Sequence, residues 1–384
     1  SISHRSIMLG ALADGCTRIT GFLEGEDALA TLQAFRALGV AIEGPCEGEV
    51  VVHGVGMSGL SAPQGELYLG NSGTSMRLLA GLLAAQSFEV TLVGDASLSS
   101  RPMERVAAPL RLMGASVLTA EGGVPPLTTG GGARLKGVRY AMPMASAQVK
   151  SSLLLAGLFA EGDTTVIEPA PTRDHTERML NAFGCAVEKT GSAVCITGPA
   201  TLRACDIDVP ADISSAAFFI VGASIAMGSD IVLPHVGINP TRTGVIDIMR
   251  LMGADIELVN LSEVGGEPVA DIRVRSASLK GIHVPEELVP LAIDEFPVLF
   301  IAAACADGET VVSGAEELRV KESDRIQVMA DGLQALGVNA RPTVDGMIIQ
   351  GGGAISSGSV HSHDDHRIAM AFSMAALRAD GSIR

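Results

Sequence analysis

The sequence predicts an α+β fold, classed as α/β by some schemes, in which helices pack on sheets. Two kinds of helix-like segment alternate along the chain, and strand-like segments with alternating Val, Ile and Thr lie between them. Helices of the first kind end at glycines that are separated by 75, 70, 69 and 84 residues. These gaps are too regular for chance and too long for a solenoid repeat, so we expect one unit to be used repeatedly.

The first kind of segment is an amphipathic helix that ends at a glycine and is followed by a short polar strand. ALGVAIEG from Ala37 and LMGADIEL from Leu251 are examples. Glycine suits the position after a helix, where the backbone turns left-handed and a side chain would be strained. The glycines predicted to lie there are Gly39, Gly114, Gly184, Gly253 and Gly337.

The second kind of segment is apolar and rich in small residues. Its copies open on polar residues near Ser1, Asn71, Ser146, Ile213, Glu295 and Asp365. Five of these six copies run into a turn and a strand, whereas the sixth reaches only Ala379-Asp380-Gly381 before the chain stops at Arg384. We therefore expect a chain that is cut inside its last unit, and also at the front, where it begins directly at a helix opening.

Three units per domain is the natural partition of the six helices of the second kind. We place the boundary near Val209-Pro210, because Pro210 and Asp212 interrupt two apolar segments there. The predicted domains are therefore residues 1–210 and residues 211–384, the second of them incomplete.

Composition and charge indicate a small partner. The formal net charge is -16, aromatic residues make up 3% and Trp is absent, which argues against nucleic acid or an anionic membrane as the partner. The apolar runs are shorter than the roughly 20 residues of a membrane-spanning helix. The six cysteines form no CxxC pair, so we expect reduced thiols in a cytoplasmic protein. An acidic protein can still bind anions where its cations gather locally.

The most concentrated chemistry lies in RVKESDR, residues 319–325. A strand-like run from Glu309 to Val312 precedes this turn, and a helix-like run with Ile326 and Leu333 on one face follows it. The turn is thus predicted at a helix N-terminus, where free N–H groups and the helix dipole favour anions. A solvated, salt-bridged turn is the alternative.

Further polar residues fall at strand-to-helix turns or at openings of the second kind of helix. They include Arg5, Asn71, Gly73, Arg77, Arg101, Ser146, Gln148, Arg173, Arg242, Asp294, Glu295, His366 and Arg367. Arginine suits bidentate binding of phosphate and carboxylate. No nucleophile–base pair and no cofactor fingerprint is visible, so the pattern indicates a site for small anions. Lys321, Glu322 and Asp294 are the candidate proton carriers.

Two of these stretches have simpler structural interpretations. Residues 70–75, GNSGTS, resemble a phosphate-cradling loop but lack the lysine of a P-loop, and an ordinary Asn/Ser helix cap is the preferred interpretation. Residues 364–367, with His361 and His363 nearby, could suggest a metal site. A capping Asp beside Arg explains them more simply, so no metal is expected.

Three further side chains are given structural interpretations. His4 and His175 are interpreted as cap or surface residues rather than catalysts. Lys150, inside VKSSLLL, is interpreted as a surface lysine whose stem lies along apolar neighbours.

Eight motifs follow one another along nearly the whole chain. They are SISHR (1–5), LGNSGTSMR (69–77), GDASLSSRPM (94–103), PMASAQVKS (143–151), TRDHTE (172–177), IDEFP (293–297), RVKESDR (319–325) and DHRIAM (365–370). In this order they closely resemble the 5-enolpyruvylshikimate-3-phosphate synthase family. The resemblance implies two domains of three βαβαββ units each, in which every domain is a pseudo-threefold, inside-out α/β barrel, and which close like a hinge over the substrates.

The resemblance also implies an activity and a site. The family transfers the enolpyruvyl group of phosphoenolpyruvate to the 5-hydroxyl of shikimate 3-phosphate, without metal or organic cofactor, and a monomer is expected. By matching motifs, the residues implied for shikimate 3-phosphate are Ser1, Arg5, Ser146, Gln148, Arg173, Asp294 and Lys321. Those implied around phosphoenolpyruvate are Gly73, Arg101, Glu322, Arg325 and Arg367, and Asn71 and Ala147 are implied as further substrate-binding residues. Asp294 is the candidate base, and Glu322 and Lys321 are the candidate acids.

The chain departs from the family pattern at both ends. The family places a lysine immediately before SISHR, and it continues beyond the last residues of this chain. We therefore expect the chain alone to be inactive, or to be a fragment of a longer protein.

Gly73 leaves space where glyphosate-tolerant relatives tend to carry Ala, so the parent enzyme is expected to be sensitive to glyphosate.

Two other functions remain open at this point. The sister enolpyruvyl transferase that acts on UDP-N-acetylglucosamine has a similar fold, but it typically carries a Cys where this chain has Ser99-Ser100-Arg101. A catalytically incompetent, phospho-ligand-binding fragment is the alternative from another class.

Overall fold

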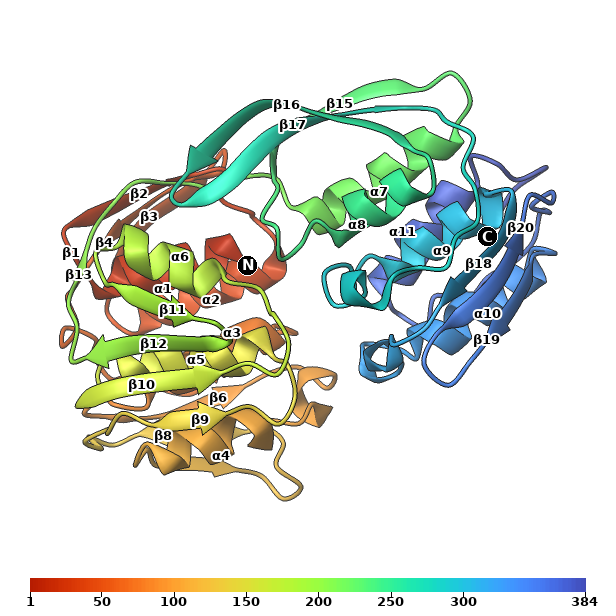
Figure 1. The fold of residues 1–384 in the computed structure, drawn as a ribbon. Coiled ribbons are helices and arrows are strands. Elements are labelled where there is room, and N and C mark those ends of the chain that lie inside the picture. The colour runs from red at the N-terminus through yellow and green to blue at the C-terminus, as the bar shows by residue number, and fades with distance from the viewer. The chain divides into compact units, whose positions relative to one another are not determined.

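The computed structural model describes all of residues 1–384. They divide into two compact units (Figure 1). Unit 1 comprises Ser1–Val209 together with Val264–Glu267, and unit 2 comprises Pro210–Glu263 together with Pro268–Arg384. Each unit has its own hydrophobic core. No helix in either unit combines the length and the apolar character needed to cross a membrane.

Unit 1 contains three four-stranded sheets with the same topology. In each sheet one edge strand runs parallel to its neighbour, and the other pairs are antiparallel. The first sheet has the order β14 (Ile207–Asp208), β2 (Cys16–Thr20), β4 (Glu49–His53) and β3 (Ala41–Cys46). The second has the order β5 (Leu67–Tyr68), β6 (Glu89–Val93), β8 (Leu127–Gly130) and β7 (Val117–Thr119). The third has the order β11 (Val187–Thr190), β12 (Ala193–Gly198), β10 (Gly162–Ile167) and β9 (Arg139–Ala141).

The helices between these strands complete the βαβαββ order that the resemblance implied. The inner helices are α1 (Ile2–Leu12), α3 (Gly73–Leu83) and α5 (Ala147–Gly157), and the outer ones are α2 (Glu26–Ala37), α4 (Glu104–Leu112) and α6 (His175–Ala182). In the first repeat the leading strand is β14, which comes from the far end of unit 1. A short parallel pair, β1 (Ala13–Asp14) with β13 (Leu202–Arg203), and a 3-10 turn, Leu98–Ser100, are additional.

The inner helices of unit 1 are buried on almost every side, as their apolar sequences require. The sheets lie outside them (Figure 1), which confirms the inside-out arrangement. Small residues let these helices approach closely: a Cβ added to Gly81 of α3 would lie 2.0 Å from the carbonyl oxygen of Ser152 in α5.

The predicted left-handed glycines are confirmed at all five positions. Gly39, Gly114, Gly184, Gly253 and Gly337 have φ angles of 88°, 95°, 83°, 93° and 80°. Each lies one residue beyond the C-cap of an outer helix, where a side chain would be strained. The glycine signal therefore located the end of every outer helix.

Unit 2 repeats the same order with shorter leading strands. Its inner helices are α7 (Ile213–Ile225), α9 (Phe296–Cys305) and α11 (His366–Ala375), and its outer ones are α8 (Gly244–Leu251) and α10 (Arg325–Ala335). Its sheets have the orders β15 (Asp230–Gly237), β17 (Glu267–Arg275), β16 (Asp255–Val264), and β18 (Gly308–Val312), β20 (Met347–Gly351), β19 (Asn339–Pro342). Parallel leading strands are reduced to bridges such as Ala211 with Val236. Two 3-10 turns, Glu286–Leu288 and Glu316–Val320, were not expected.

Candidate functional site

Arg5 joins three helices of unit 1. Its side chain lies in α1 and is buried, and Nε donates to Oγ1 of Thr176 in α6 (2.7 Å). Nη2 donates to Oγ of Ser151 in α5 (3.0 Å), and Nη1 donates to the carbonyl oxygen of Ser1 (3.2 Å). One cation therefore holds the N-terminal halves of α1, α5 and α6 together and adds positive charge there.

Ser146, Ala147 and Gln148 form the start of α5, as predicted. Ser146 is the N-cap, and its hydroxyl accepts a hydrogen bond from the N–H of Val149 (3.4 Å). Ala147 is the first helical residue, and Nε2 of Gln148 donates to Oγ1 of Thr74 in α3 (3.1 Å). A helix start of this kind offers N–H groups without intrahelical partners, and such groups bind anions.

Asn71 and Arg101 come together beside the start of α3. Nη2 of Arg101 donates to Oδ1 of Asn71 (2.6 Å), and Nδ2 of Asn71 donates to Oδ2 of Asp95 (2.8 Å). The N–H of Leu98 also donates to Asp95, and this bond, with Asn71 and the Arg101 charge, lowers the pKa of the Asp95 carboxyl. The carboxylate thus fixes the amide that orients the guanidinium.

Gly73 is the first residue of α3 and lies against two guanidinium groups. An added Cβ would be 2.9 Å from Nη1 of Arg77 and 3.2 Å from Nη1 of Arg101. Ser72 is the N-cap, and its hydroxyl accepts from the N–H of Ser75 (3.2 Å), so the predicted helix cap is confirmed. Arg77 belongs to this cationic group, although the motif had marked it only as part of a helix opening.

Arg173 is half-buried in the turn between β10 and α6. The turn runs from Glu168 to Asp174, and α6 begins at His175. The next residue, Thr176, is the one that accepts the hydrogen bond from Arg5. Arg5 therefore contacts the first turn of α6, and the turn that carries Arg173 leads directly into that helix.

In unit 2 the candidate base, Asp294, lies beside two predicted cations. Nζ of Lys321 is 3.4 Å from Oδ1 of Asp294, and Nη1 of Arg325 is 3.6 Å from the same oxygen. Lys321 also pairs with the exposed Glu317 at 2.7 Å. The Asp294 carboxylate therefore faces two positive charges just before α9.

Arg325 is buried among acidic side chains at the start of α10. Its Nε donates to Oδ2 of Asp365 (2.8 Å), and its Nη2 donates to Oε2 of Glu322 (2.6 Å). Asp365 is also the N-cap of α11, where it accepts from the N–H of Arg367 (3.0 Å). Burial acts to raise the pKa of Asp365, but the hydrogen bonds and charge of Arg325 outweigh it, and the pKa lies below its usual value. The predicted capping Asp beside Arg is confirmed.

Arg367 is held by the segment that precedes α9. Its Nη1 donates to the carbonyl oxygen of Asp294 (3.0 Å) and lies 3.8 Å from Oε1 of the buried Glu295. Ser214 donates to Glu295, and Nη2 of Arg242 donates to Ser214 (2.5 Å). The sequence had marked Glu295 and Arg242 only by their positions near helix starts; their contact through Ser214 depends on the fold.

Arg319 and Asp324 hold the 319–325 turn in place. Nη1 of Arg319 donates to Oδ2 of Asp324 (2.6 Å), and Nε donates to the carbonyl oxygen of Val344 (2.7 Å). Asp324 is the N-cap of α10 and accepts from the N–H of Gln327 (3.1 Å). These bonds attach the turn to the β19–β20 hairpin.

The interpretation of both histidines was wrong, because neither is a cap or a surface residue. His4 is buried and hydrogen-bonded through Nδ1 to Oγ1 of Thr31 (2.8 Å) and to Oγ of Ser75 (3.2 Å). His175 is buried, and its Nδ1 lies 2.6 Å from Oε1 of Glu267, in the part of β17 that belongs to unit 1. Both partners are remote in sequence, so no local pattern could indicate them.

Lys150 was also interpreted wrongly. Its side chain is 0% exposed, and its ammonium lies 2.9 Å from Oε1 of Glu168 and 2.6 Å from Oε1 of Glu177. Both carboxylates are buried. Burial raises the pKa of Glu177, against the opposing effect of Lys150. Lys150 is thus part of the interior of unit 1.

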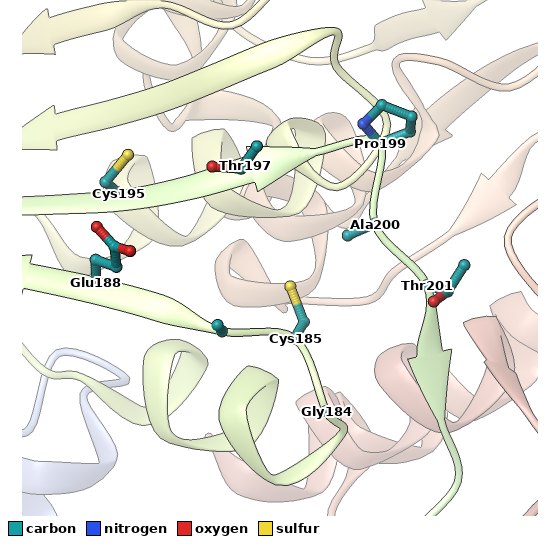
Figure 2. Close-up of a pocket in the computed structure, with 9 residues that line it drawn as sticks. Gly184, Cys185, Glu188, Cys195, Thr197, Pro199, Ala200 and Thr201 are labelled. Carbon is teal, nitrogen blue, oxygen red and sulfur yellow. The ribbon is translucent and has the colours of Figure 1, made fainter.

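A cavity of about 320 Å³ lies beside the β11–β12 hairpin of unit 1 (Figure 2). Residues of the hairpin and its flanks line it, including Cys185, Glu188, Cys195 and Thr197. Burial raises the pKa of the Cys185 thiol. None of the predicted site residues is among those that line this cavity, so it is separate from the arginine-rich helix starts.

The fold and the cations at its helix starts define a two-unit α+β protein suited to small anionic substrates. Residues 1–384 match the family described as EPSP synthase (3-phosphoshikimate 1-carboxyvinyltransferase). The chain belongs to the EPSP synthase family.

Two curated relatives and one solved structure illustrate the similarity. The 3-phosphoshikimate 1-carboxyvinyltransferase of Nitrosococcus oceani is 69% identical over 383 residues, which cover 100% of this chain and 86% of that protein. The enzyme of the same name from Alkalilimnicola ehrlichii is 70% identical over 379 residues, or 99% and 85% of the two chains. An EPSP synthase structure from Acinetobacter baumannii has a TM-score of 0.92 and 63% identity, and the match covers 99% of this chain and 87% of that one.

Proposed function

We infer that this chain transfers the enolpyruvyl group of phosphoenolpyruvate to the 5-hydroxyl of shikimate 3-phosphate and releases phosphate. The observation that carries the inference is the family match along residues 1–384. The 69% identity to the Nitrosococcus oceani enzyme of that name supports it. The chemistry of the helix starts supports it, because both substrates are anions and the cations gather there. Arginine binds phosphate and carboxylate through paired N–H groups.

We propose that the residues implied by the motifs hold shikimate 3-phosphate. These are Ser1, Arg5, Ser146, Gln148, Arg173, Asp294 and Lys321, and Ala147 is proposed as a further substrate-binding residue. The connection of Arg5 to α5 and α6 supports this assignment, since it gathers hydroxyl, amide and guanidinium donors on neighbouring helix starts. Such donors suit a ligand with one phosphate and several hydroxyl groups.

We propose that a second set of residues surrounds phosphoenolpyruvate. These are Gly73, Arg101, Glu322, Arg325 and Arg367, and Asn71 is proposed as a further substrate-binding residue. Carboxylates hold these guanidinium groups in place, directly or through a neighbouring side chain. A pre-oriented cation loses less freedom when an anion binds, which favours affinity.

The proposed reaction is an addition followed by an elimination. The 5-hydroxyl oxygen attacks C2 of the enol while Asp294 takes the hydroxyl proton, and Glu322 or Lys321 delivers a proton to C3. The tetrahedral intermediate then loses phosphate from C2 and a proton from C3, so the double bond is restored. The position of the Asp294 carboxylate beside Lys321 and Arg325, at 3.4 and 3.6 Å, supports its place among the groups that handle protons.

We further propose that the protein acts as a monomer in the cytoplasm, with residues 1–210 forming one domain and residues 211–384 the other. The six cysteines support this location because all of them are free thiols, as is usual in a reducing compartment.

Phosphate release from phosphoenolpyruvate tests the activity. The protein is assayed with shikimate 3-phosphate and, in parallel, with UDP-N-acetylglucosamine. We expect release with shikimate 3-phosphate alone. Release with the nucleotide sugar would assign the chain to the sister activity, and tight binding of shikimate 3-phosphate without release would identify a ligand-binding protein.

A further inference from the structure

The ion pairs of Lys150 connect three elements of unit 1. Lys150 lies in α5, Glu168 directly follows β10, and Glu177 lies in α6. All three side chains are withdrawn from water, with exposed fractions of 0%, 3% and 9%. A buried ammonium is costly unless carboxylates lie close to it. The two carboxylates therefore restrict the position of the Lys150 ammonium.

Glu168 has a second role that Glu177 does not share. Its Oε1 accepts a hydrogen bond from the backbone N–H of Thr172 (3.1 Å) and another from the Thr172 hydroxyl (2.5 Å). The same oxygen is the one that faces Nζ of Lys150. One carboxylate oxygen therefore closes the turn on itself and attaches it to α5.

The composition of the turn leaves few backbone donors. Its sequence from residue 168 is EPAPTRD, and Pro169 and Pro171 have no backbone N–H to donate. Thr172 follows these prolines, and its N–H is one of the few donors that can bind the Glu168 carboxylate. Arg173 follows Thr172 directly, so the place where the carboxylate holds the backbone is one residue from the guanidinium-bearing residue.

We propose that Lys150 and Glu168 are positioning residues for Arg173. Lys150 holds Glu168, Glu168 holds the backbone at Thr172, and this connection sets where the Arg173 side chain enters the shikimate 3-phosphate site. The inference rests on the proposed role of Arg173 as a ligand of that substrate. It assigns a function to a buried ion pair that touches neither substrate.

Matched alanine substitutions test the proposal. Glu168→Ala and Glu177→Ala each remove one carboxylate from the same ammonium, but only Glu168→Ala releases the turn. We expect Glu168→Ala to raise the Kd of shikimate 3-phosphate about tenfold, as for loss of one charged hydrogen bond, and to leave the KM of phosphoenolpyruvate within about twofold. Glu177→Ala should change neither constant by more than about twofold. Calorimetric titration and thermal melting of each variant supply the measurements.

Three further variants keep the test independent of a loss of folding in Glu168→Ala. Glu168→Gln keeps an acceptor oxygen for Thr172 and should restore most of the affinity. Thr172→Val removes only the hydroxyl bond of a half-buried side chain and should raise the same Kd about threefold. Lys150→Met should resemble Glu168→Ala in its selectivity for shikimate 3-phosphate.

The outcomes separate this inference from the proposed function. If Arg173→Ala leaves the Kd of shikimate 3-phosphate unchanged, the assignment of Arg173 is wrong. If Arg173→Ala weakens binding but Glu168→Ala and Thr172→Val do not, the positioning role is wrong. Equal losses in Glu168→Ala and Glu177→Ala would also overturn it, because they would reduce the ion pairs to a purely structural role.

Discussion

Asp365 accepts a hydrogen bond from Nε of Arg325 at 2.8 Å, and both side chains are buried, with exposed fractions of 0% and 1%. The same carboxylate accepts from the hydroxyl of Ser323 (3.0 Å) and from the N–H of Arg367 (3.0 Å). One acidic side chain thus orients a predicted ligand of phosphoenolpyruvate and caps the helix that carries another. We therefore expect changes at Asp365 to affect both stability and the proposed substrate binding.

Asp365→Ala is therefore expected to destabilise unit 2. It leaves the Arg325 charge buried with fewer partners, and breaking a buried ion pair on one side typically lowers the free energy of unfolding by about 3–5 kcal/mol. Chemical denaturation measures the change. Asp331→Ala, at an exposed position of α10, is the control and should alter stability by less than about 0.5 kcal/mol. Equal effects of the two substitutions would contradict the role given to Asp365.

His4 should make the protein less stable as the pH falls. Burial, reinforced by the charge of Arg5, holds the pKa of His4 well below its usual value. Below about pH 6.5 the unfolded chain binds a proton that the folded protein excludes. The stability due to neutral His4 is thus complete above that pH and is lost as the pH falls towards the folded-state pKa.

The measurement is the free energy of unfolding between about pH 7 and pH 5. The contribution of His4 to its slope is at most about 1.4 kcal/mol per pH unit, and His4→Gln should flatten the slope. His283→Gln removes an exposed imidazole instead and should leave it as in the parent protein. A slope that His4→Gln does not change would show that His4 does not contribute.

Gly73→Ala should weaken inhibition by glyphosate. The new Cβ meets the guanidinium ends of Arg77 and Arg101 at 2.9 and 3.2 Å, so these flexible groups must shift, and Arg101 is a proposed ligand of phosphoenolpyruvate. We expect the inhibition constant to rise at least about tenfold, equivalent to about 1.4 kcal/mol, with a smaller rise in the KM of phosphoenolpyruvate. Gly65→Ala is the control, because an added Cβ there has nothing within 4 Å. An unchanged inhibition constant would contradict the prediction.

Asp294→Asn should reduce kcat more than it changes either KM. Loss of a general base typically lowers the rate by about 10²–10⁴-fold. Glu317→Gln is the matched control, because Glu317 is the other carboxylate paired with Lys321, at 2.7 Å, and it is largely exposed. Steady-state phosphate release compares the two variants. A similar kcat for both would show that Asp294 acts only as a partner of Lys321.

The sequence located most of the elements because their signals are local. A glycine after a helix, a capping hydroxyl and an apolar period of three to four residues each act within a few positions of the chain. Ser72 and Asp365 were therefore recognisable as caps, and the ends of the outer helices as glycines. The motifs added the family, because they keep its order along residues 1–370.

Other features could not be predicted from the sequence, because they depend on contacts that leave no local signal in the chain. The leading strands of unit 2 are reduced to bridges such as Ala211 with Val236, and a bridge of one residue pair has no periodicity to detect. Glu295 and Arg242 meet through Ser214, whose position in α7 is far from both in sequence. The sequence near each of these residues therefore gives no sign that they contact one another.

By itself the sequence determined the repeated unit, the ends of its helices, the family and the helix starts at which the cations gather. Only the tertiary structure decided which charges face water and which face each other. Lys150 was the clearest case: its local pattern is that of a surface lysine, yet it is buried against Glu168 and Glu177, 18 and 27 residues further along. Burial depends on the elements that pack over a residue, and ion pairs form across those elements, so neither follows from the residues adjacent in the chain.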